Sequence, residues 1–562
     1  MQRVEVPVLV VGAGPVGMTA ALLLAHQGVE SLVVDRRAGP HRAPQAHVVN
    51  PRSLEIFRAL GVDTAALRAM ATPRADGGHV SFVTTLTGPE IGRLPYERQD
   101  DAVLALTPEP LLNLSQHKLE PYLLGCLRDT PATGVRWRHE WLSGAEDADG
   151  VSARIRDLER DETYEVRSRW LLAADGAGSR VRQALRIAMI GPDRLQSFAM
   201  IHVEADLRAL VRDRPACIYW LLDPATPGAF IAHDIDRSWV LMHQFDPATE
   251  SPDDYTDAVC AGLVRRAIGR DDVALAVRDV SIWHMTSQIA ERYRAGRVFL
   301  VGDSAHRFPP AGGMGMNSGI QDAHNLAWKL RAVAEGWAGA ALLDTYEAER
   351  RPVAQRNADQ SLRNALRMIE MYADLGLAGE PDATRAHLEA LLADPAGRRL
   401  LAAAVARQQD HFDMLGLQLG FAYDGAGAAI VPDGSAPPAP ANPVRDYVPT
   451  TRPGGRLPHA WVTEGGTRRS LLDLLAPDAF TLIAPADVAR PAARAAGDGP
   501  AIRALVPGAD FDDAEGGWTA VAGAGAVLVR PDGHVAWRTP SPPAYPATVV
   551  ADVCHTLLRR PV

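Results

Sequence analysis

Apolar runs bounded by glycines and polar turns predict the first elements of the chain. Val6–Val11 has the length and composition of a buried strand, and Pro15–Gln27 has those of a helix that Gly28 ends. Ser31–Asp35 is a second short apolar strand. Together they make one β-α-β unit within about 35 residues, which is the compact size of a dinucleotide-binding fold.

The same patterns predict a helix and then a group of strands in the middle of the chain. The helix covers Gln116–Leu127, and a buried strand at Trp170–Asp175 leads into a second helix at Ser179–Leu185. Four segments of strand character follow, namely Phe198–Asp206, Cys217–Leu222, Ala229–Ile235 and Trp239–Phe245. Strands joined by short turns favour a mostly antiparallel sheet, which differs in kind from the first unit.

Longer elements are expected after residue 296. Arg297–Gly302 predicts a buried strand, and a glycine-rich loop then leads to a helix from about Ser318 to Glu335. Leu343–Met371 predicts a long helix with a break near Pro352, because proline lacks the N–H that a helix interior needs. Ala422–Pro449 is rich in Pro, Gly and Ala and is typical of a linker.

Size and composition limit the class of protein. A chain of 562 residues suggests two or three domains. A formal charge of −10 gives no general attraction to nucleic acid or acidic membranes, and no run of about 20 apolar residues predicts a membrane span. Four widely spaced cysteines argue against a disulfide framework, so we expect buried thiols in a reducing cytoplasm.

A glycine-rich turn lies between the first strand and the first helix. It reads Gly12-Ala13-Gly14-Pro15-Val16-Gly17. The first glycine permits a tight turn, the second lets the backbone approach a pyrophosphate, and the third lets helix and strand pack closely. Asp35 ends the next strand, where a carboxylate can bind ribose hydroxyls. The turn therefore predicts a dinucleotide site, and a chance glycine turn before a core helix is the weaker alternative.

Two further motifs, each after a buried strand, indicate FAD among the dinucleotides. One begins at Asp175 and reads Asp175-Gly176-Ala177-Gly178-Ser179-Arg180-Val181-Arg182, and the other is Gly302-Asp303-Ser304-Ala305-His306 with the run that continues to Asn317. Taken alone, the first could be a capped turn and the second an ordinary glycine loop. An aspartate at a strand end beside a glycine-rich helix start suits ribityl hydroxyls, and loop N–H groups can face an electron-rich ring edge.

The three motifs, in this order and spacing, resemble those of the single-component FAD-dependent aromatic hydroxylases, typified by para-hydroxybenzoate hydroxylase and phenol hydroxylase. The runs Gln321–Leu330 and Tyr346–Pro352 are most similar to the branch of 2,4-dichlorophenol 6-monooxygenase and polyketide hydroxylases. The resemblance is specific over about residues 5–360 and looser beyond. It implies an α/β (α+β) fold with a Rossmann-type FAD domain of the para-hydroxybenzoate hydroxylase fold, an antiparallel-sheet substrate domain and a C-terminal thioredoxin-like domain.

The same resemblance implies how the chain divides. We expect a discontinuous FAD-binding domain over residues 1–75, 105–186 and 287–400, and a substrate-binding domain over 76–104 and 187–286. Residues 401–449 would be a helix end and linker, and 450–562 the thioredoxin-like domain, with strands near Phe480–Ile483 and Ala526–Val529. This last domain has no CxxC pair, which excludes thiol–disulfide exchange, so a structural or dimer-contact role in a monomer or homodimer is expected.

The resemblance also implies residues that bind the cofactor. Gly12–Gly17 would hold the pyrophosphate, and Asp35 with Arg36 would take the adenosine ribose and its surroundings. Gln116 and Asp175 resemble residues that contact FAD, and Asp175 is also credited with NAD(P)H contacts.

At the flavin end, Asp303 would bind ribityl or ribose oxygens. Gly315 lies in the loop whose Met316 and Asn317 N–H groups would meet flavin N1 and O2. Pro310 would line the space where oxygen reacts.

In this family the cofactor carries the difficult chemistry. NADPH or NADH reduces FAD, and O2 then adds at the flavin C4a carbon to give a hydroperoxide that attacks an electron-rich ring. The protein must exclude water, place the ring and help to deprotonate a phenol. The resemblance therefore implies an NAD(P)H-dependent monooxygenase that hydroxylates a phenolic or polyketide-derived aromatic substrate.

His47 is the first candidate for activating a phenol, whose pKa near 10 requires a base or a strong acceptor. In phenol hydroxylase-like members this position lies beside the flavin ring, and histidine titrates near pH 6.5. A surface or capping histidine is an equally good interpretation. The family often has an arginine at the position of Gln45, two residues earlier, which puts one phosphate or NAD(P)H contact in doubt; Arg42 could substitute.

Several side chains on the predicted antiparallel sheet could face the substrate: Tyr219, Trp220, His233 and His243. A plain packing role is favoured for each, because aromatic side chains in strands are more often core than binding site. The 17 histidines show no metal-binding spacing with a carboxylate partner, so no metal site is predicted.

Two other classes of function stay open. One is a different FAD oxidoreductase, such as a dehydrogenase, halogenase, epoxidase or Baeyer-Villiger-type oxygenase. A disulfide reductase needs a reactive cysteine pair and a flavin halogenase a WxWxIP motif, and the sequence has neither. The other class is a non-catalytic flavin-binding protein. The sequence does not distinguish NADH from NADPH or name the aromatic substrate.

Overall fold

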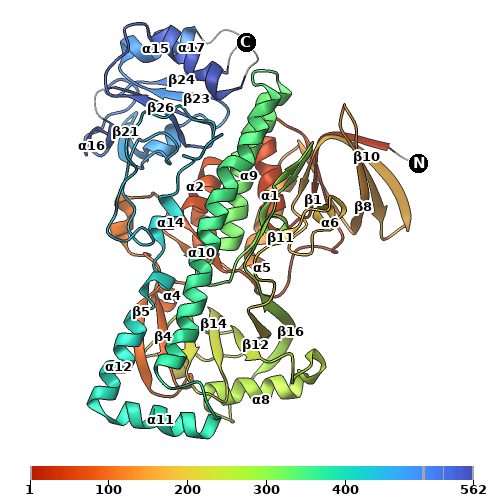
Figure 1. Ribbon diagram of the computed structural model, residues 1–562, viewed down its shortest axis with the longest axis vertical. Coiled ribbons are helices and arrows are strands. Elements are labelled where there is room, and N and C mark those ends of the chain that lie inside the picture. The colour runs from red at the N-terminus through yellow and green to blue at the C-terminus, as the bar shows by residue number, and fades with distance from the viewer. Residues whose placement is uncertain (1–2, 496–499, 523–524, 560–562) are drawn as a thin grey trace.

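The computed structural model describes residues 3–495, 500–522 and 525–559. The molecule is elongated, with a parallel sheet and its helices in the middle, a second sheet below and the C-terminal segment above (Figure 1). Among the described residues, no helix is both long enough and apolar enough to cross a bilayer.

The first sheet has a parallel core with the strand order β19-β10-β1-β2-β7. These strands are β1 (Arg3–Val11), β2 (Ser31–Asp35), β7 (Thr133–Trp137), β10 (Glu162–Ala173) and β19 (Val298–Leu300). Val8, Leu9 and Val10 are fully buried, as expected for a parallel strand covered on both faces. The predicted first strand, helix and second strand are confirmed, with α1 covering Pro15–His26.

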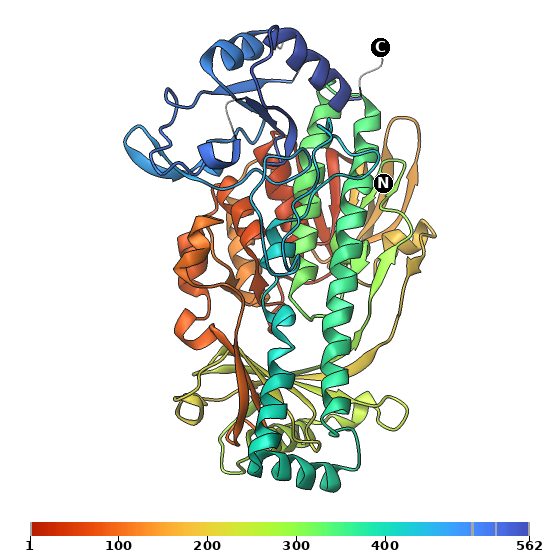
Figure 2. The same ribbon diagram turned by 60° about the vertical axis from the view of Figure 1, so that its left-hand side comes forward.

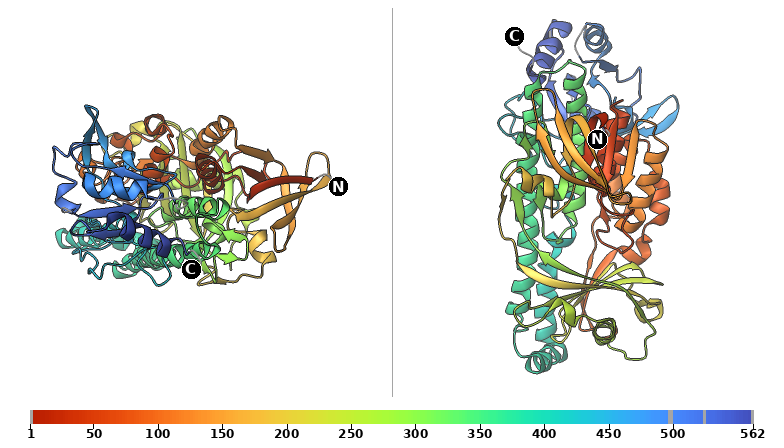
Figure 3. Two further views of the ribbon diagram at one scale, coloured as in Figure 1. Left: turned by 90° about the horizontal axis from the view of Figure 1, so that it is seen from above. Right: turned by 90° about the vertical axis from the view of Figure 1, so that its right-hand side faces the viewer.

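Antiparallel strands extend this sheet on one side. β9 (Val151–Asp157) pairs with the first half of β10, β8 (His139–Glu146) pairs with β9, and the two strands project from the body of the molecule (Figure 3). Helices α5 (Gln116–Arg128) and α9 (Met314–Ala334) both pack against α1.

The second sheet has seven strands in the order β16-β12-β15-β14-β13-β4-β5, all antiparallel except the β13–β4 pair. They are β4 (His79–Val83), β5 (Glu90–Pro95), β12 (Gln196–Glu204), β13 (Ile218–Leu221), β14 (Gly228–Asp234), β15 (Ser238–Phe245) and β16 (Ala276–Met285). The prediction of a mostly antiparallel sheet is confirmed. The domain bounds themselves stay a prediction.

Helices cover both faces of the second sheet. α8 (Asp257–Ile268) packs on one face, with Cys260, Val264 and Ile268 buried. The other face meets α10 (Thr345–Asp374), α12 (Pro395–Ala406) and α13 (Gln409–Phe412). α10 starts beside the first sheet and ends beside the second, so it connects the two layers (Figure 2).

Two predicted boundaries on these helices were wrong. α9 begins at Met314, four residues before the expected Ser318. Gly315 lies in its first turn, where backbone N–H groups need no partner within the helix, so this glycine does not prevent the helix from starting there. α10 passes through Pro352 without a break. Proline costs one hydrogen bond, but the helix keeps a buried stripe that includes Tyr346, Glu349, Arg350 and Val353, and this packing maintains its course.

The predicted linker has almost no regular structure, yet it is fastened to the protein rather than free. Ala429 N donates to Glu349 Oε1 at 2.8 Å, and Val431 N donates to Ala536 O at 2.8 Å. Ala429 and Tyr447 are buried.

The C-terminal segment contains a four-stranded sheet in the order β24-β23-β25-β26. β23 (Phe480–Ile483) and β25 (Ala526–Val529) have the predicted bounds, and β24 (Ile502–Leu505) is parallel to β23 while β26 (Val535–Thr539) completes an antiparallel hairpin. Helices α15 (Ala486–Arg494) and α17 (Pro546–Leu557) pack against each other beside it.

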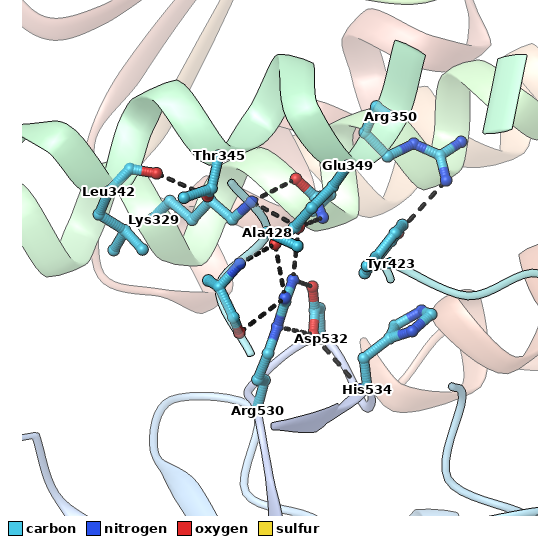
Figure 4. A network of polar contacts seen from close by, with 12 residues as sticks. Lys329, Leu342, Thr345, Glu349, Arg350, Tyr423, Ala428, Arg530, Asp532 and His534 are labelled. Carbon is cyan, nitrogen blue, oxygen red and sulfur yellow. Dashed lines mark hydrogen bonds and ion pairs between the residues drawn. The ribbon is translucent and has the colours of Figure 1, made fainter. Parts of the chain in front are cut away.

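A buried ionic network joins this segment to α9 and α10 (Figure 4). Arg530 donates to both carboxylate oxygens of Glu349, at 2.8 and 2.9 Å, and to Asp532. Lys329 Nζ lies 2.7 Å from Glu349 Oε2, and all four side chains are almost fully buried. Because charges buried in this way must keep their partners, the network makes the C-terminal segment integral to the helices beneath it.

Candidate active site

The predicted cofactor residues meet at one edge of the first sheet. Gly12 follows β1, Asp35 ends β2, Asp175 follows β10 and Asp303 follows β19. These strands are parallel neighbours, so their carboxyl ends lie side by side. The chain adds β2 on one side of β1 and β10 on the other, and ligands of α/β folds bind where the strand order reverses in this way.

The glycine turn has the geometry that a pyrophosphate requires. Gly12 has φ of +108°, and a Cβ there would lie 2.2 Å from Ala174 O. A Cβ on Gly17 would lie 1.9 Å from Gly12 O, so strand and helix touch at this point. A Cβ on Gly14 would meet no atom within 4 Å. No side chain caps α1, so the N–H groups of its first turn after Pro15 have no side-chain partner at the N-cap.

Asp35 is held by backbone and side-chain donors. Its Oδ2 accepts from Ala13 N at 2.7 Å, and its Oδ1 accepts from Arg37 N at 2.8 Å. Burial alone would raise the pKa of Asp35, but hydrogen bonds and the charge of Arg37 lower it below the usual range. Arg36, the residue expected beside the ribose, is exposed, whereas the unpredicted Arg37 contacts Asp35 through its guanidinium.

Gln116 begins α5 and belongs to a second polar cluster near Arg37. Its Nε2 donates to Glu120 Oε1 at 2.7 Å, and its backbone N donates to Ala46 O at 2.7 Å. Glu120 is fully buried and also accepts from His41 N at 2.7 Å. Glu120 and His41 were missed, because only the fold brings residues 79 positions apart into contact.

Asp175 and Asp303 differ in their partners. Asp175 accepts from Ser179 Oγ at 2.5 Å and from Val181 N at 3.2 Å, while burial raises the pKa of its carboxyl. Among the described residues, no hydrogen bond reaches the Asp303 side chain. Asp303 stays accessible to solvent, while the protein packed around it raises the pKa of its carboxyl. An acidic side chain with free oxygens at this edge can accept hydrogen bonds from a ligand hydroxyl.

The loop before α9 offers free N–H groups. Gly312 and Gly313 have φ of +117° and +62°, and a Cβ on Gly313 would lie 2.6 Å from Val48 Cβ. With Gly313 as N-cap and no side-chain cap, the groups without helical partners are those of Met314, Gly315 and Met316. Asn317 lies one position further in.

The Asn317 side chain fastens a neighbouring loop to α9. Its Oδ1 accepts from Asn50 N at 2.9 Å, and its Nδ2 donates to Val48 O at 2.9 Å. Pro310, before the two glycines, is exposed.

Asp322 on α9 is an unpredicted residue that organises the segment around Asp303. It is fully buried, and it contacts His306 Nε2 at 2.7 Å, Arg350 Nε at 2.7 Å and Gly302 N at 3.2 Å. The run Gln321–Leu330 carries the family resemblance, but it contains no local signal for this geometric role of Asp322.

His47 lies at the seam between the two sheets. Its ring stacks on Tyr96 with centroids 6.2 Å apart and meets His233 edge-on at 5.5 Å. Its Nδ1 is 3.3 Å from Asn113 Oδ1. Burial lowers the pKa of His47 to about 4, although Asn113 opposes this shift. His47 is therefore uncharged near neutral pH, and its imidazole can accept a hydrogen bond.

The four candidates on the second sheet divide between its two faces. Trp220 faces α10 and α13, where its ring lies 6.1 Å from that of His411, and His233 faces His47. Tyr219 belongs to the opposite core beneath α8, and its hydroxyl is used by Arg214 O and Ala216 N. His243 lies near Tyr255, 6.3 Å between ring centroids, on that same opposite side.

One face of the second sheet forms an apolar wall, here called the inner wall. It consists of Phe198, Met200, Trp220, Met242, Trp283 and Met285. Phe198 and Trp283 stack at 5.9 Å, and Ala311 of the loop before α9 belongs to the same cluster. The inner wall thus reaches the residue next to Pro310. Flat apolar and aromatic side chains of this kind suit an aromatic ring.

These features fit FAD. The glycine turn leaves space at Gly14, Asp303 keeps its carboxylate oxygens free, and α9 begins with uncapped N–H groups. No group of three or more metal-ligating side chains occurs in the part of the chain that the structure describes.

Comparison with known proteins places the chain in a family. A profile described as FAD binding domain matches residues 5–361, and one described as Aromatic-ring hydroxylase, C-terminal, matches residues 450–561. The chain belongs to the FAD-dependent aromatic-ring hydroxylases. The hydroxylase is 33% identical to 2,4-dichlorophenol 6-monooxygenase of Cupriavidus pinatubonensis, over 99% of this chain and 97% of the relative.

Two further relatives cover the whole length of the hydroxylase. Aklavinone 12-hydroxylase RdmE of Streptomyces purpurascens is 36% identical over 99% of each chain. The flavin-dependent monooxygenase PieE, solved in complex with FAD and substrate, is 36% identical and superimposes with a TM-score of 0.92 over 100% of each chain. The hydroxylase is thus an FAD-dependent monooxygenase with the fold expected from the three motifs, and the alternative of a non-catalytic flavin-binding protein is excluded.

Proposed function

We propose that this hydroxylase holds FAD along the carboxyl edge of its first sheet and hydroxylates a phenolic or polyketide-derived aromatic compound placed against the inner wall. The observation that carries the proposal is that the inner wall continues into Ala311, next to the uncapped start of α9. When it is bound and reduced by NADH or NADPH, FAD supplies the chemistry that activates O2, and one atom of that O2 enters the aromatic ring of the substrate.

The adenosine half of the cofactor is assigned to the N-terminal turn. Gly14 gives the pyrophosphate access to the N–H groups of α1, where the helix dipole favours negative charge. Asp35 would accept hydrogen bonds from the ribose, with Arg37 rather than Arg36 closing over it. Gln116 and Asp175 stay proposed cofactor contacts.

The flavin half is assigned to the segment after β19. Asp303 would accept from ribityl hydroxyls, and the N–H groups of Met314, Gly315 and Met316 would donate to the oxygen-bearing edge of the ring. The predicted donor Asn317 then acts mainly through its side chain, which keeps Val48 and Asn50 against α9.

Substrate placement is assigned to the inner wall and His47. The wall excludes water and offers flat side chains to a planar ring. The neutral His47 accepts a hydrogen bond from a ring hydroxyl, which shifts electron density toward the ring and favours attack by an electrophilic oxygen. A ring hydroxyl is present in compounds that relatives are named for, such as dichlorophenol and aklavinone.

Some finer assignments complete the proposal. The topology β24-β23-β25-β26 supports a thioredoxin-like C-terminal domain of structural role. The four cysteines lie far apart in the sequence and three of them are buried, which supports reduced thiols in a cytoplasmic protein. We propose a monomer or homodimer with the domain bounds given above.

The test begins with the absorption spectrum of the purified protein, with and without added FAD. The oxidation of NADH and NADPH is then followed in the presence of a panel of monocyclic phenols and polycyclic quinols under 18O2, and the masses of the products are measured by mass spectrometry. We expect a bound flavin, substrate-stimulated oxidation and gain of one labelled oxygen on the ring. A protein that takes up no flavin, or a labelled product that is an ester or epoxide, would contradict the proposal.

A further inference from the structure

His47 is placed beside Asn113 by a short strand pairing. β3 (Val48–Val49) pairs with β6 (Leu112–Asn113), with Val48 opposite Asn113. The pairing brings Asn113 Oδ1 to 3.3 Å from His47 Nδ1. Asn113 is 3% exposed, so water does not compete for its amide.

The orientation of the Asn113 amide follows from its other partner. Asn113 Nδ2 donates to Gly77 O at 3.2 Å, and Gln99 Nε2 donates to the same carbonyl at 3.2 Å. A Cβ on Gly77 would lie 3.1 Å from Asn113 Nδ2, so glycine leaves room for the amide. Because a carbonyl only accepts, the NH2 group must face Gly77 and the oxygen must face His47.

This orientation determines which nitrogen of His47 carries hydrogen. If Nδ1 carried no hydrogen, its lone pair would point at a lone pair of Asn113 Oδ1. Nδ1 must therefore carry the hydrogen and donate it to Asn113 Oδ1. The Cys217 thiol also lies near Nδ1, with Sγ at 3.8 Å, but a thiol is only a weak hydrogen-bonding group and does not displace the amide. Tyr96 and His233 contact the ring by stacking and by an edge. A neutral imidazole with hydrogen on Nδ1 has a bare Nε2.

We propose that Asn113 is a positioning residue, which holds His47 in the tautomer with hydrogen on Nδ1 and so presents Nε2 as the acceptor for the substrate hydroxyl. The second half of this statement rests on the proposed function, while the tautomer does not. Asn113 acts on the ring hydroxyl only through His47.

The tautomer can be measured directly in FAD-loaded protein with 15N-labelled histidine. Long-range 1H–15N correlation spectra separate the protonated from the bare nitrogen of a neutral imidazole, and the signals lost in His47→Gln identify His47. We expect hydrogen on Nδ1 at pH 7 in the unsubstituted protein. Asn113→Leu should move it toward Nε2. Gln99→Leu is the matched control, because it removes the other side-chain bond to Gly77 O, together with the bond from Gln99 Nε2 to Tyr96 O at 2.8 Å, and keeps the bond between Asn113 and His47.

Hydroxylation assays of the same proteins test the consequence. Asn113→Leu should lower kcat by about a hundredfold, the usual contribution of one proton-accepting group, with a smaller change in KM. Asn113→Asp keeps an acceptor at Nδ1 and should restore much of kcat. Hydrogen on Nε2 in the unsubstituted protein, or an equal shift in Gln99→Leu, would overturn the proposal. If the expected tautomer is found but no phenol is hydroxylated, the role of Asn113 in setting the tautomer of His47 stands and the proposed function is refuted instead.

Discussion

Glu97 is a buried carboxyl whose removal should change how stability depends on pH. It follows β5 with a φ of +53°, its side chain is 6% exposed, and it accepts from Met414 N and Gln418 Nε2, both at 3.1 Å. Burial raises its pKa to about 8, against the hydrogen bonds that oppose the shift. We predict that Glu97→Gln stabilises the protein at pH 8 much more than at pH 5.

The size of the effect follows from proton linkage. Below about pH 4.5 the carboxyl is protonated in both states, so it contributes no pH dependence. Between that pH and about 8, the unfolded chain loses the proton while the native protein keeps it, so stability falls as pH rises. At about 1.4 kcal/mol per pH unit the full loss is at most roughly 5 kcal/mol, and we expect about 2–4 kcal/mol between pH 5 and 8.

The assay is urea unfolding at pH 5 and at pH 8, for the unsubstituted protein and for Glu97→Gln. For each protein, the free energy of unfolding at pH 8 is subtracted from that at pH 5, and the two differences are then subtracted from each other. The contributions of other titrating groups cancel in this step, because glutamine keeps the size and an acceptor oxygen of glutamate. Glu370→Gln, an exposed change on α10, is the control and should show no pH-dependent difference. A subtracted difference near zero would mean that Glu97 titrates alike in both states, and the reasoning would be refuted.

Three further predictions concern the cofactor site, the C-terminal segment and the inner wall. Gly17→Ala, whose Cβ would lie 1.9 Å from a backbone oxygen, should abolish FAD retention and folding, measured by flavin absorbance and circular dichroism. Gly14→Ala, which meets open space, should fold normally but weaken FAD binding about tenfold or more in fluorescence titration. Arg530→Met leaves the buried Asp532 carboxylate without its ion-pair partner and leaves Glu349 with Lys329 as its only cation, and should cost about 3–5 kcal/mol in urea unfolding. Trp220→Ala should raise the substrate KM about tenfold through lost ring contact, whereas Tyr219→Phe on the opposite face should leave it unchanged; equal effects would contradict the inner wall as substrate site.

Features set by neighbouring residues were predictable. The run Ser31–Asp35, the glycine turn and the strands at Phe480 and Ala526 have local signals, and their bounds agree with the structure. The meeting of Gly12, Asp35, Asp175 and Asp303 was also within reach, because parallel strands end at a common edge.

The continuity of α10 through Pro352 was harder to predict from the sequence. Pro352 carries a strong local signal against helix, and a sequence pattern weighs only that signal. The buried stripe of α10 against α9 outweighs it, and such packing involves residues distant along the chain.

The amino-acid order alone therefore dictates the local elements, the FAD motifs and the family, because these depend on side chains close together in the chain. Tertiary structure alone assigns Trp220 and Tyr219 to opposite faces, buries Glu97 beneath Met414, and pairs His47 with Asn113. Burial and hydrogen-bond orientation are properties of surroundings that other parts of the chain supply. They set the proton state of Glu97 and His47, and with it the chemistry that each can perform.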